Sequence, residues 1–345
     1  MQNDLEIKIM NKKYLALVFS AFWPGLGYLY LGKYALGISL SFIWFFLFSR
    51  FLQTWPLPVV MDQTRVQYYL IWGVMVFLWL VILTDLYQTL KKDENLRTSF
   101  WPLVPFFILI PLYFYFCLPL KWRQPNAVIG SLHTHTNCSD GVADYETTIN
   151  LAQKLKYDFI AITDHAFANP IPCQVPPCPS SPCQTALTKC KTETRLLCLP
   201  GQEVTGKVHI IAVNIDRSID PHQSIKKIVQ DIHDQGGLAI AAHPYNPEGE
   251  GRIPVDELTT AGFDAMECER SSFTNNQQQY RISKDFNLPC FYSNDAHEIG
   301  MLKTVYSVCS QKIKTFADLK EAIKGNKCRR FAPLDYLIAN FIDLL

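Results

Sequence analysis

Several motifs that mark common enzyme classes are missing from the sequence. It has no GxSxG nucleophile elbow, no GxGxxG dinucleotide fingerprint and no GxxxxGK[ST] phosphate loop. It also lacks a long run of lysine and arginine, and its 32 basic and 31 acidic residues nearly cancel. Composition therefore gives no indication of a nucleic-acid partner, because such surfaces are usually basic.

Charge is scarce in the first third of the chain. Between Tyr14 and Leu120 the charged residues are confined to five single positions and one short polar run. Four uncharged stretches result, each near the roughly 20 residues that a helix needs to cross a bilayer, and Trp and Tyr lie near their ends. We therefore expect an integral cell membrane protein, with buried helices of a soluble domain as the alternative. The four expected transmembrane helices are 14–32, 34–52, 66–88 and 100–120.

Two features give opposite indications of membrane orientation. With four spans, the N-terminal segment, the loop at 50–65 and the residues after 120 carry seven Lys or Arg, against four on the other side. This bias favours both chain ends in the cytoplasm. Five of the eleven cysteines, however, crowd into one proline-rich stretch, where they could form disulfides in an oxidising compartment, remain free or form a separate metal loop. The five are Cys173, Cys178, Cys183, Cys190 and Cys198, and the side of the membrane stays open.

Beyond Lys121, short apolar runs alternate with helix-like segments, which is typical of an α/β fold. Strands are expected at 128–136, 158–165, 196–204, 207–215, 237–244, 264–269, 289–295 and 305–309. Helices are expected at 144–156, 222–235, 275–286 and 315–324.

Metal-ligating residue types collect on these strands and at their ends. In the stretch SLHTHT the period of two places His133 and His135 on one face, so both imidazoles can reach one point. The other strand-end residues are Asp164, His165, Glu203, His243, Asp295 and His297. Because a closed or nearly closed α/β barrel gathers the carboxyl ends of its strands around one mouth, these residues predict a single site.

Six motifs in this order resemble the PHP family, the polymerase and histidinol phosphatase metal-dependent phosphoesterases. They are HTHTNCSDG (133–141), ITDH (162–165), PGQEV (200–204), VHIIAV (208–213), AAHP (241–244) and SNDAH (293–297). The resemblance spans about 200 residues and implies a distorted (β/α)7 TIM-like barrel with two to three divalent metal ions.

The resemblance also implies which residues hold each ion. His133, His135, Glu203 and Asp295 would hold the first, and Glu203 would bridge to a second that His209 and His243 also bind. The third would take Asp140, His165 and His297, with Asp140 standing where some members have histidine. Asp164 is expected to orient a neighbouring ligand rather than bind an ion.

Mixed imidazole and carboxylate ligands suit zinc, manganese or iron. Paired ions favour hydrolysis of a phosphomonoester or phosphodiester, with a nucleotide ester among the candidates, by metal-bound hydroxide. Four basic residues are candidates for a phosphate contact: Arg252, Arg270, Arg281 and Lys303. Arg270 is preferred, because it lies just past a strand end. A small phosphorylated substrate is expected, and oligomeric state is not indicated. A catalytically silent sensor module and a metallohydrolase of a non-phosphate bond are the alternatives.

The expected organisation is a membrane region over 1–120, a connector at 121–128 and a hydrolase barrel over 129–345 with a Cys/Pro-rich insertion at 170–198.

Overall fold

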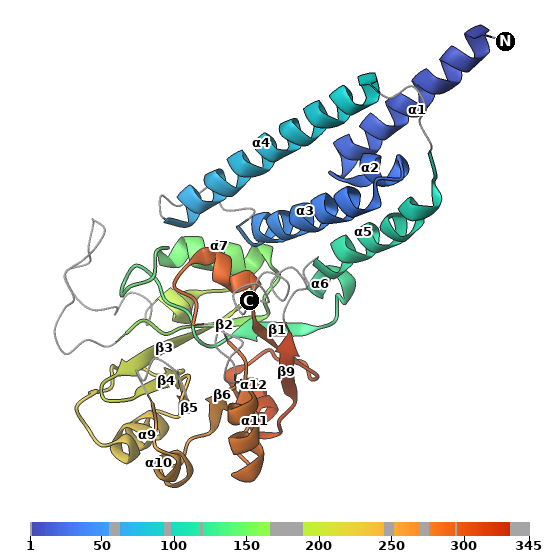
Figure 1. The fold of residues 1–345 in the computed structure, drawn as a ribbon. Helices are drawn as coiled ribbons and strands as arrows, with labels where there is room; N and C mark the ends of the chain where they lie inside the picture. Colours follow the sequence, from blue (N-terminus) through green and yellow to red (C-terminus); the bar gives the residue numbers. More distant parts are fainter. Residues whose placement is uncertain are drawn as a thin grey trace. The chain divides into compact units, whose positions relative to one another are not determined.

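The computed structural model describes residues 2–54, 63–92, 98–117, 120–165, 189–244, 252–268, 276–293 and 295–331. The described residues divide into two compact units, which lie within residues 2–117 and within residues 120–331. Figure 1 shows helices alone in the described part of the first unit, and strands with flanking helices in the second.

The first unit consists of apolar helices joined by tight turns. Its helices are α1 (Gln2–Phe22), α2 (Leu26–Tyr30), α3 (Tyr34–Thr54), α4 (Gln63–Lys92), the 3-10 turn η1 (Trp101–Leu103) and α5 (Val104–Cys117). Gly25 ends the first helical run because its φ of 100° lies in the left-handed region, and an added Cβ would meet the carbonyl oxygen of Gly37 at 2.4 Å. The backbone therefore turns between α1 and α2, inside the first predicted span.

The prediction of about four transmembrane helices is wrong for the described residues. Only Tyr69–Lys92, within α4, is long and apolar enough to cross a membrane, and most of its residues are exposed. The segment expected at 14–32 is split at Gly25. The apolar helical stretches Tyr34–Ser49, which is part of α3, and Trp101–Tyr113 are each shorter than 18 residues. Counting apolar residues cannot detect such a turn, because hydropathy does not depend on backbone direction. Integral membrane localisation therefore stays a prediction that rests on one helix.

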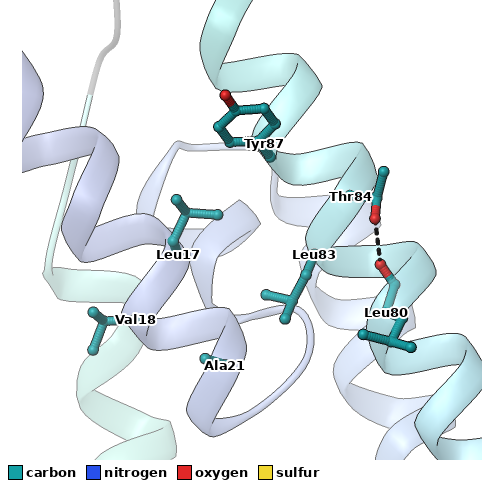
Figure 2. Close-up of a pocket in the computed structure, with 7 residues that line it drawn as sticks. All are labelled: Leu17, Val18, Ala21, Leu80, Leu83, Thr84 and Tyr87. Carbon is teal, nitrogen blue, oxygen red and sulfur yellow. Dashed lines mark hydrogen bonds between the residues drawn. The ribbon is translucent and has the colours of Figure 1, made fainter.

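An apolar groove of about 430 Å³ lies between α1 and α4. Figure 2 shows its lining side chains, among which the hydroxyl of Thr84 donates a 2.8 Å hydrogen bond to the carbonyl of Leu80 within α4. The lining residues are Leu17, Val18, Ala21, Leu80, Leu83, Thr84 and Tyr87. No side chain in this set carries a charge, so the groove offers nothing for hydrolysis.

The second unit is built on one nine-stranded sheet in the order β7-β6-β5-β4-β3-β2-β1-β8-β9. The strands are β1 (Val128–Ser131), β2 (Phe159–Ile162), β3 (Leu197–Thr205), β4 (His209–Val213), β5 (Leu238–Ala241), β6 (Ala265–Glu267), β7 (Cys290–Phe291), β8 (Tyr306–Cys309) and β9 (Cys328–Phe331). β1, β2 and β3 are parallel, as are β5, β6 and β7, whereas β4 runs antiparallel to both of its neighbours. β8 likewise runs antiparallel to both β1 and β9, so β4 and β8 interrupt the parallel arrangement of the sheet.

The sheet curves far enough for its two ends to meet. The backbone N–H of Tyr292, after β7, donates to the hydroxyl of Ser307 on β8, which in turn donates to the carbonyl of Tyr292, both at 3.0 Å. Apolar residues alternate along the strands and fill the interior, among them Phe159, Ile211 and Phe291. The prediction of a barrel-like α/β sheet is thus confirmed, and the carboxyl ends of its parallel strands face one region.

Helices follow most strands of this unit. They are α6 (Leu120–Arg123), α7 (Tyr145–Lys154), α9 (Ile225–Asp234), α10 (Val255–Thr260), α11 (Asn276–Asp285), η2 (Ile299–Lys303) and α12 (Phe316–Lys324). α9 packs on β5 and α10 on α9, as can be followed in Figure 1. Local sequence sets their starts, since Asp144 and Ser224 cap α7 and α9 and Thr315 forms a capping box with Asp318 at α12.

Six cysteines of the described residues form three disulfides within this unit. The pairs are Cys190–Cys198, Cys268–Cys290 and Cys309–Cys328. The last two join neighbouring strands, β6 with β7 and β8 with β9. Cys190–Cys198 attaches the end of the predicted insertion to β3, whereas Cys173, Cys178 and Cys183 lie outside the described residues.

Candidate metal centre

The two histidines of the SLHTHT stretch follow β1 directly. Thr134, between them, forms an isolated parallel bridge with Ala296, so the chain stays extended beyond the end of the strand. Extended backbone turns alternate side chains to the same face, and the rings of His133 and His135 lie with centroids 5.0 Å apart. Both residues are buried. The pair thus enters the interior at the carboxyl end of the sheet.

Glu203 of β3 and Asp295, after β7, complete a buried cluster with these histidines. Nε2 of His133 lies 3.3 Å from Oε2 of Glu203 and 3.2 Å from Oδ1 of Asp295. Nε2 of His135 lies 3.4 Å and 3.0 Å from the same two oxygens. The structure therefore brings together the four residues that the resemblance assigned to one ion.

The second carboxylate oxygen of Glu203 faces another cluster. Its Oε1 lies 2.9 Å from Nδ1 of His209, at the start of β4, and 3.2 Å from Nε2 of His243, just after β5. The antiparallel pairing of β4 with β3 and β5 is what places these two histidines beside Glu203. Glu203 joins the two clusters with one oxygen in each, as a bridging ligand would.

A third cluster lies at the more exposed side of the site and contains His135, Asp140, His165 and His297. Oδ2 of Asp140 lies 3.2 Å from Nε2 of His165 and 3.1 Å from Nε2 of His297. Burial by itself raises the pKa of Asp140, but hydrogen bonds from these two histidines lower it. Burial lowers the pKa of His165, but hydrogen bonds to Asp140 and Glu203 outweigh it and raise that pKa to about 10. The side chain of Asp140 is 38% exposed, so this cluster faces the opening.

Asp164 and Arg270 were also expected at the site. Asp164 accepts hydrogen bonds from the backbone and hydroxyl of Thr136, at 2.6 and 2.8 Å, and from the hydroxyl of Ser139 at 2.8 Å. It belongs to none of the three clusters and instead holds the loop that carries Asp140. Arg270 lies outside the described residues.

Sequence reasoning missed Glu267, the last residue of β6. It is 1% exposed, and its Oε1 lies 3.0 Å from Nδ1 of His133. Its Oε2 accepts a 2.8 Å hydrogen bond from the backbone N–H of His243, and the hydroxyl of Ser293 donates to Oε1 at 2.5 Å. The signal was present, because an acidic residue ends a short apolar run in DAMECE as it does in LLCLPGQEV.

Opposite charges compensate one another inside the centre. Burial lowers the pKa of His133, but the negative charges of Glu267, Asp295 and Glu203 hold that pKa well above its ordinary value. Burial raises the pKa values of Glu203 and Asp295, and the charge of His133 outweighs it and holds both well below their usual range. Burial prevails at His135 and lowers its pKa. The carboxylates are therefore ionised at neutral pH and ready to bind cations.

Two residues of the centre have strained backbone. His243 has a φ of 24° and Asp295 a φ of 51°, and side chains with a Cβ rarely adopt such values. Strain of this kind costs on the order of 1–3 kcal/mol and persists where surrounding contacts hold the residue in place. Both residues belong to a metal-type cluster, so the strained backbone occurs where a candidate metal ligand is held in position.

The donor set fits transition-metal ions. Within the described residues, no hydrogen bond reaches Nε2 of His133 or Nε2 of His135, although both atoms are buried. Donors about 2.1 Å from a tetrahedral ion lie about 3.4 Å apart, which is close to the 3.0–3.4 Å separations in the first cluster. Imidazole and carboxylate together suit zinc, manganese or iron rather than calcium. A divalent ion between these atoms would accept the lone pairs that they direct at one another.

The chain is similar to one family of proteins and to one curated relative. Residues 273–328 match the family described as PHP-associated. The uncharacterized protein MJ1587 of Methanocaldococcus jannaschii is 30% identical over 128 residues, which cover 34% of this chain and 67% of the relative.

Two solved structures match part of the chain at low identity. A two-domain protein of Bacteroides vulgatus containing a predicted PHP-like metal-dependent phosphoesterase is 16% identical, with a TM-score of 0.47 over 63% of this chain and 70% of that one. The lesion-specific endonuclease PfuEndoQ of Pyrococcus furiosus is 15% identical, with a TM-score of 0.44 over 58% of this chain and 56% of that one.

Proposed function

The chain belongs to the same protein family as MJ1587, and we propose that it is a PHP-type metal-dependent phosphoesterase. The observation that carries the proposal is the buried first cluster, in which Nε2 of His133 and Nε2 of His135 have no hydrogen-bond partner among the described residues and face the carboxylates of Glu203 and Asp295. Such atoms are costly to bury unless a cation or a proton lies between them. The PHP-associated match supports the resemblance seen in the sequence motifs.

Each group of residues has a separate task in this proposal. The first cluster holds one ion, and His209 and His243 hold a second. Glu203 contributes one oxygen to each of these two sites. Asp140, His165 and His297 hold the outer position, nearest to solvent. Ions bound there would supply Lewis-acid chemistry, activating water and orienting the oxygens of an ester. The chain itself positions the ions and keeps the inner ligands away from bulk water.

Charge favours a phosphate ester over a neutral bond. The clusters contain the carboxylates of Asp140, Glu203 and Asp295, and Glu267 adds a fourth negative charge beside them. The buried carboxylate of Asp164, beside the outer cluster, adds a fifth negative charge, and three divalent ions would bring six positive charges, leaving an excess of one. A phosphomonoester dianion complements this excess, whereas an amide substrate carries no charge to match it. A catalytically silent centre is the less favoured alternative, because the ligand set is complete.

Two further parts of the proposal concern the size of the substrate and association with a membrane. We propose a small phosphorylated substrate, and the absence of a nucleic-acid partner stays a prediction. The three disulfides favour an oxidising compartment for the second unit, since they would be reduced in most cytosols. If Tyr69–Lys92 spans a bilayer, the full-length chain will stay in the membrane pellet after alkaline carbonate washing.

The test is hydrolysis of a generic aryl phosphate by the full-length chain. Replacing His133→Ala removes a ligand of the first cluster and is expected to abolish turnover while the melting transition persists. The matched control is His222→Ala, because His222 lies outside every cluster and donates through its backbone N–H to Asp220, a contact that the substitution keeps. Equal turnover by His133→Ala and wild type would remove the first cluster from the reaction.

A further inference from the structure

Glu267 is a buried carboxylate that belongs to no ligand cluster yet contacts two of them. It ends β6 and is 1% exposed. Its contacts come from three separate parts of the chain: His133 after β1, His243 after β5 and Ser293 after β7. A carboxylate in this position joins three chain segments directly behind the metal centre.

Glu267 serves as a hydrogen-bond acceptor for all three of these neighbours. The backbone N–H of His243 can only donate, and it reaches Oε2 at 2.8 Å. Nδ1 of His133 lies 3.0 Å from Oε1, and an ionised carboxylate has no proton to offer, so this ring nitrogen must carry the hydrogen. The hydroxyl of Ser293 donates to the same Oε1. Both oxygens of Glu267 are thus used as acceptors.

The consequence for His133 is that its other nitrogen points at the centre. Nε2 lies among Glu203 and Asp295 and has no hydrogen bond from a described residue. A histidine with its hydrogen on Nδ1 offers a lone pair on Nε2, and the carboxylate behind it fixes the ring orientation and strengthens the ligand. The same carboxylate holds the backbone of His243, whose φ of 24° is strained.

We propose that Glu267 is a positioning residue that presents Nε2 of His133 to the first ion and holds His243 in place for the second. The inference rests on the proposed function, because it assumes that the two clusters bind metal. It assigns to one side chain the alignment of ligands in both inner sites. An amide cannot replace it, since its NH₂ group would oppose either the N–H of His243 or the Nδ1 hydrogen of His133.

The same strand supplies a matched control. Asp264, just before β6, also accepts from a backbone N–H, that of Ala239 at 3.0 Å, and lies 2.8 Å from Nε2 of His233. It therefore makes the same two kinds of contact as Glu267, but its histidine belongs to no metal-type cluster. A structural role alone predicts similar consequences for Asp264→Asn and Glu267→Gln.

The test measures zinc affinity of the full-length chain by competition with a chromophoric chelator, together with the melting temperature. We expect Glu267→Gln to bind the two inner equivalents about 10–100-fold more weakly, as is usual when a residue behind a metal-bound histidine is lost. Glu267→Asp, which keeps the charge one methylene shorter, should recover part of this loss. Asp264→Asn should keep zinc affinity within about twofold of wild type while its melting temperature falls.

The outcomes separate this inference from the proposed function. Wild-type zinc affinity in Glu267→Gln, with loss of affinity in His133→Ala, would overturn the role of Glu267 and leave the metal centre standing. An equal loss of affinity in Asp264→Asn and Glu267→Gln would also overturn it, because both would then act through the fold. Zinc binding unaffected by His133→Ala would contradict the proposed function itself.

Discussion

Replacing Glu203→Gln tests the bridged arrangement most specifically, because Glu203 is shared by two clusters and Asp140 belongs to one. Oε2 of Glu203 faces His133 and His135, and Oε1 faces His209 and His243. Loss of this carboxylate therefore removes a ligand from two sites. The outer site loses no ligand, although Oε2 of Glu203 also lies 2.9 Å from Nδ1 of His165. Metal content is expected to fall from three equivalents to one. Asp140→Asn, which touches only the outer cluster, is expected to leave two.

The assay is elemental analysis after equilibrium dialysis against zinc. Removing one partner of a buried ion pair costs about 3–5 kcal/mol, so the metal-free Glu203→Gln variant will melt at a lower temperature than wild type. Metal content must therefore be measured on protein shown to be folded by circular dichroism at the dialysis temperature. Equal losses in the two variants would refute the assignment of Glu203 as a bridge.

Three further predictions concern the centre and its surroundings. Chelation should lower the melting temperature by about 5–10 °C, since an ion held at 100 times its Kd adds about 2.7 kcal/mol; calorimetry showing no shift would contradict bound metal. Asp164→Ala removes three hydrogen bonds to the loop before Asp140 and should weaken the outer ion selectively, by about 10-fold in a zinc titration. A loss confined to the inner ions would argue against this. Non-reducing peptide mapping should recover the three described disulfides, and mixed pairings would exclude them; the expected pairs are Cys190–Cys198, Cys268–Cys290 and Cys309–Cys328.

The inner ligands could be proposed from sequence because strand geometry restricts where they point. His133 and His135 share a face by the period of an extended chain, and barrel topology brings Glu203 and Asp295 to the same end. The division of residues among three ions came from the PHP resemblance and not from spacing. The structure groups them similarly, and it adds His135 to the outer cluster.

The role of Glu267 could not be read from the sequence, although its place at a strand end could, because that role depends on tertiary contacts. In sequence it is one acidic residue in DAMECERS, beside Glu269 and without a neighbouring histidine. Its three partners come from residues 133, 243 and 293, which only the folded sheet brings together. Local pattern shows residues that could bind an ion, but it cannot show which residue holds a ligand from behind.

The expectation of about four spans is not supported by the described residues, for a different physical reason. Apolar composition is summed over a window, whereas crossing a bilayer requires one uninterrupted helix. Gly25, with its positive φ, breaks the first segment. Near the last segment the apolar helical run is only Trp101–Tyr113, with a 3-10 turn at its start. Hydropathy records neither the turn nor the change of helix type.

The central claim, that the clustered histidines and carboxylates form a hydrolytic metal centre, is tested most directly by metal removal and return. Full-length protein is stripped with a chelator, dialysed and assayed with a generic aryl phosphate as zinc or manganese is titrated back. The account predicts no hydrolysis by the stripped protein and recovery that follows the filling of the sites. Full hydrolysis by folded, metal-free protein would contradict it.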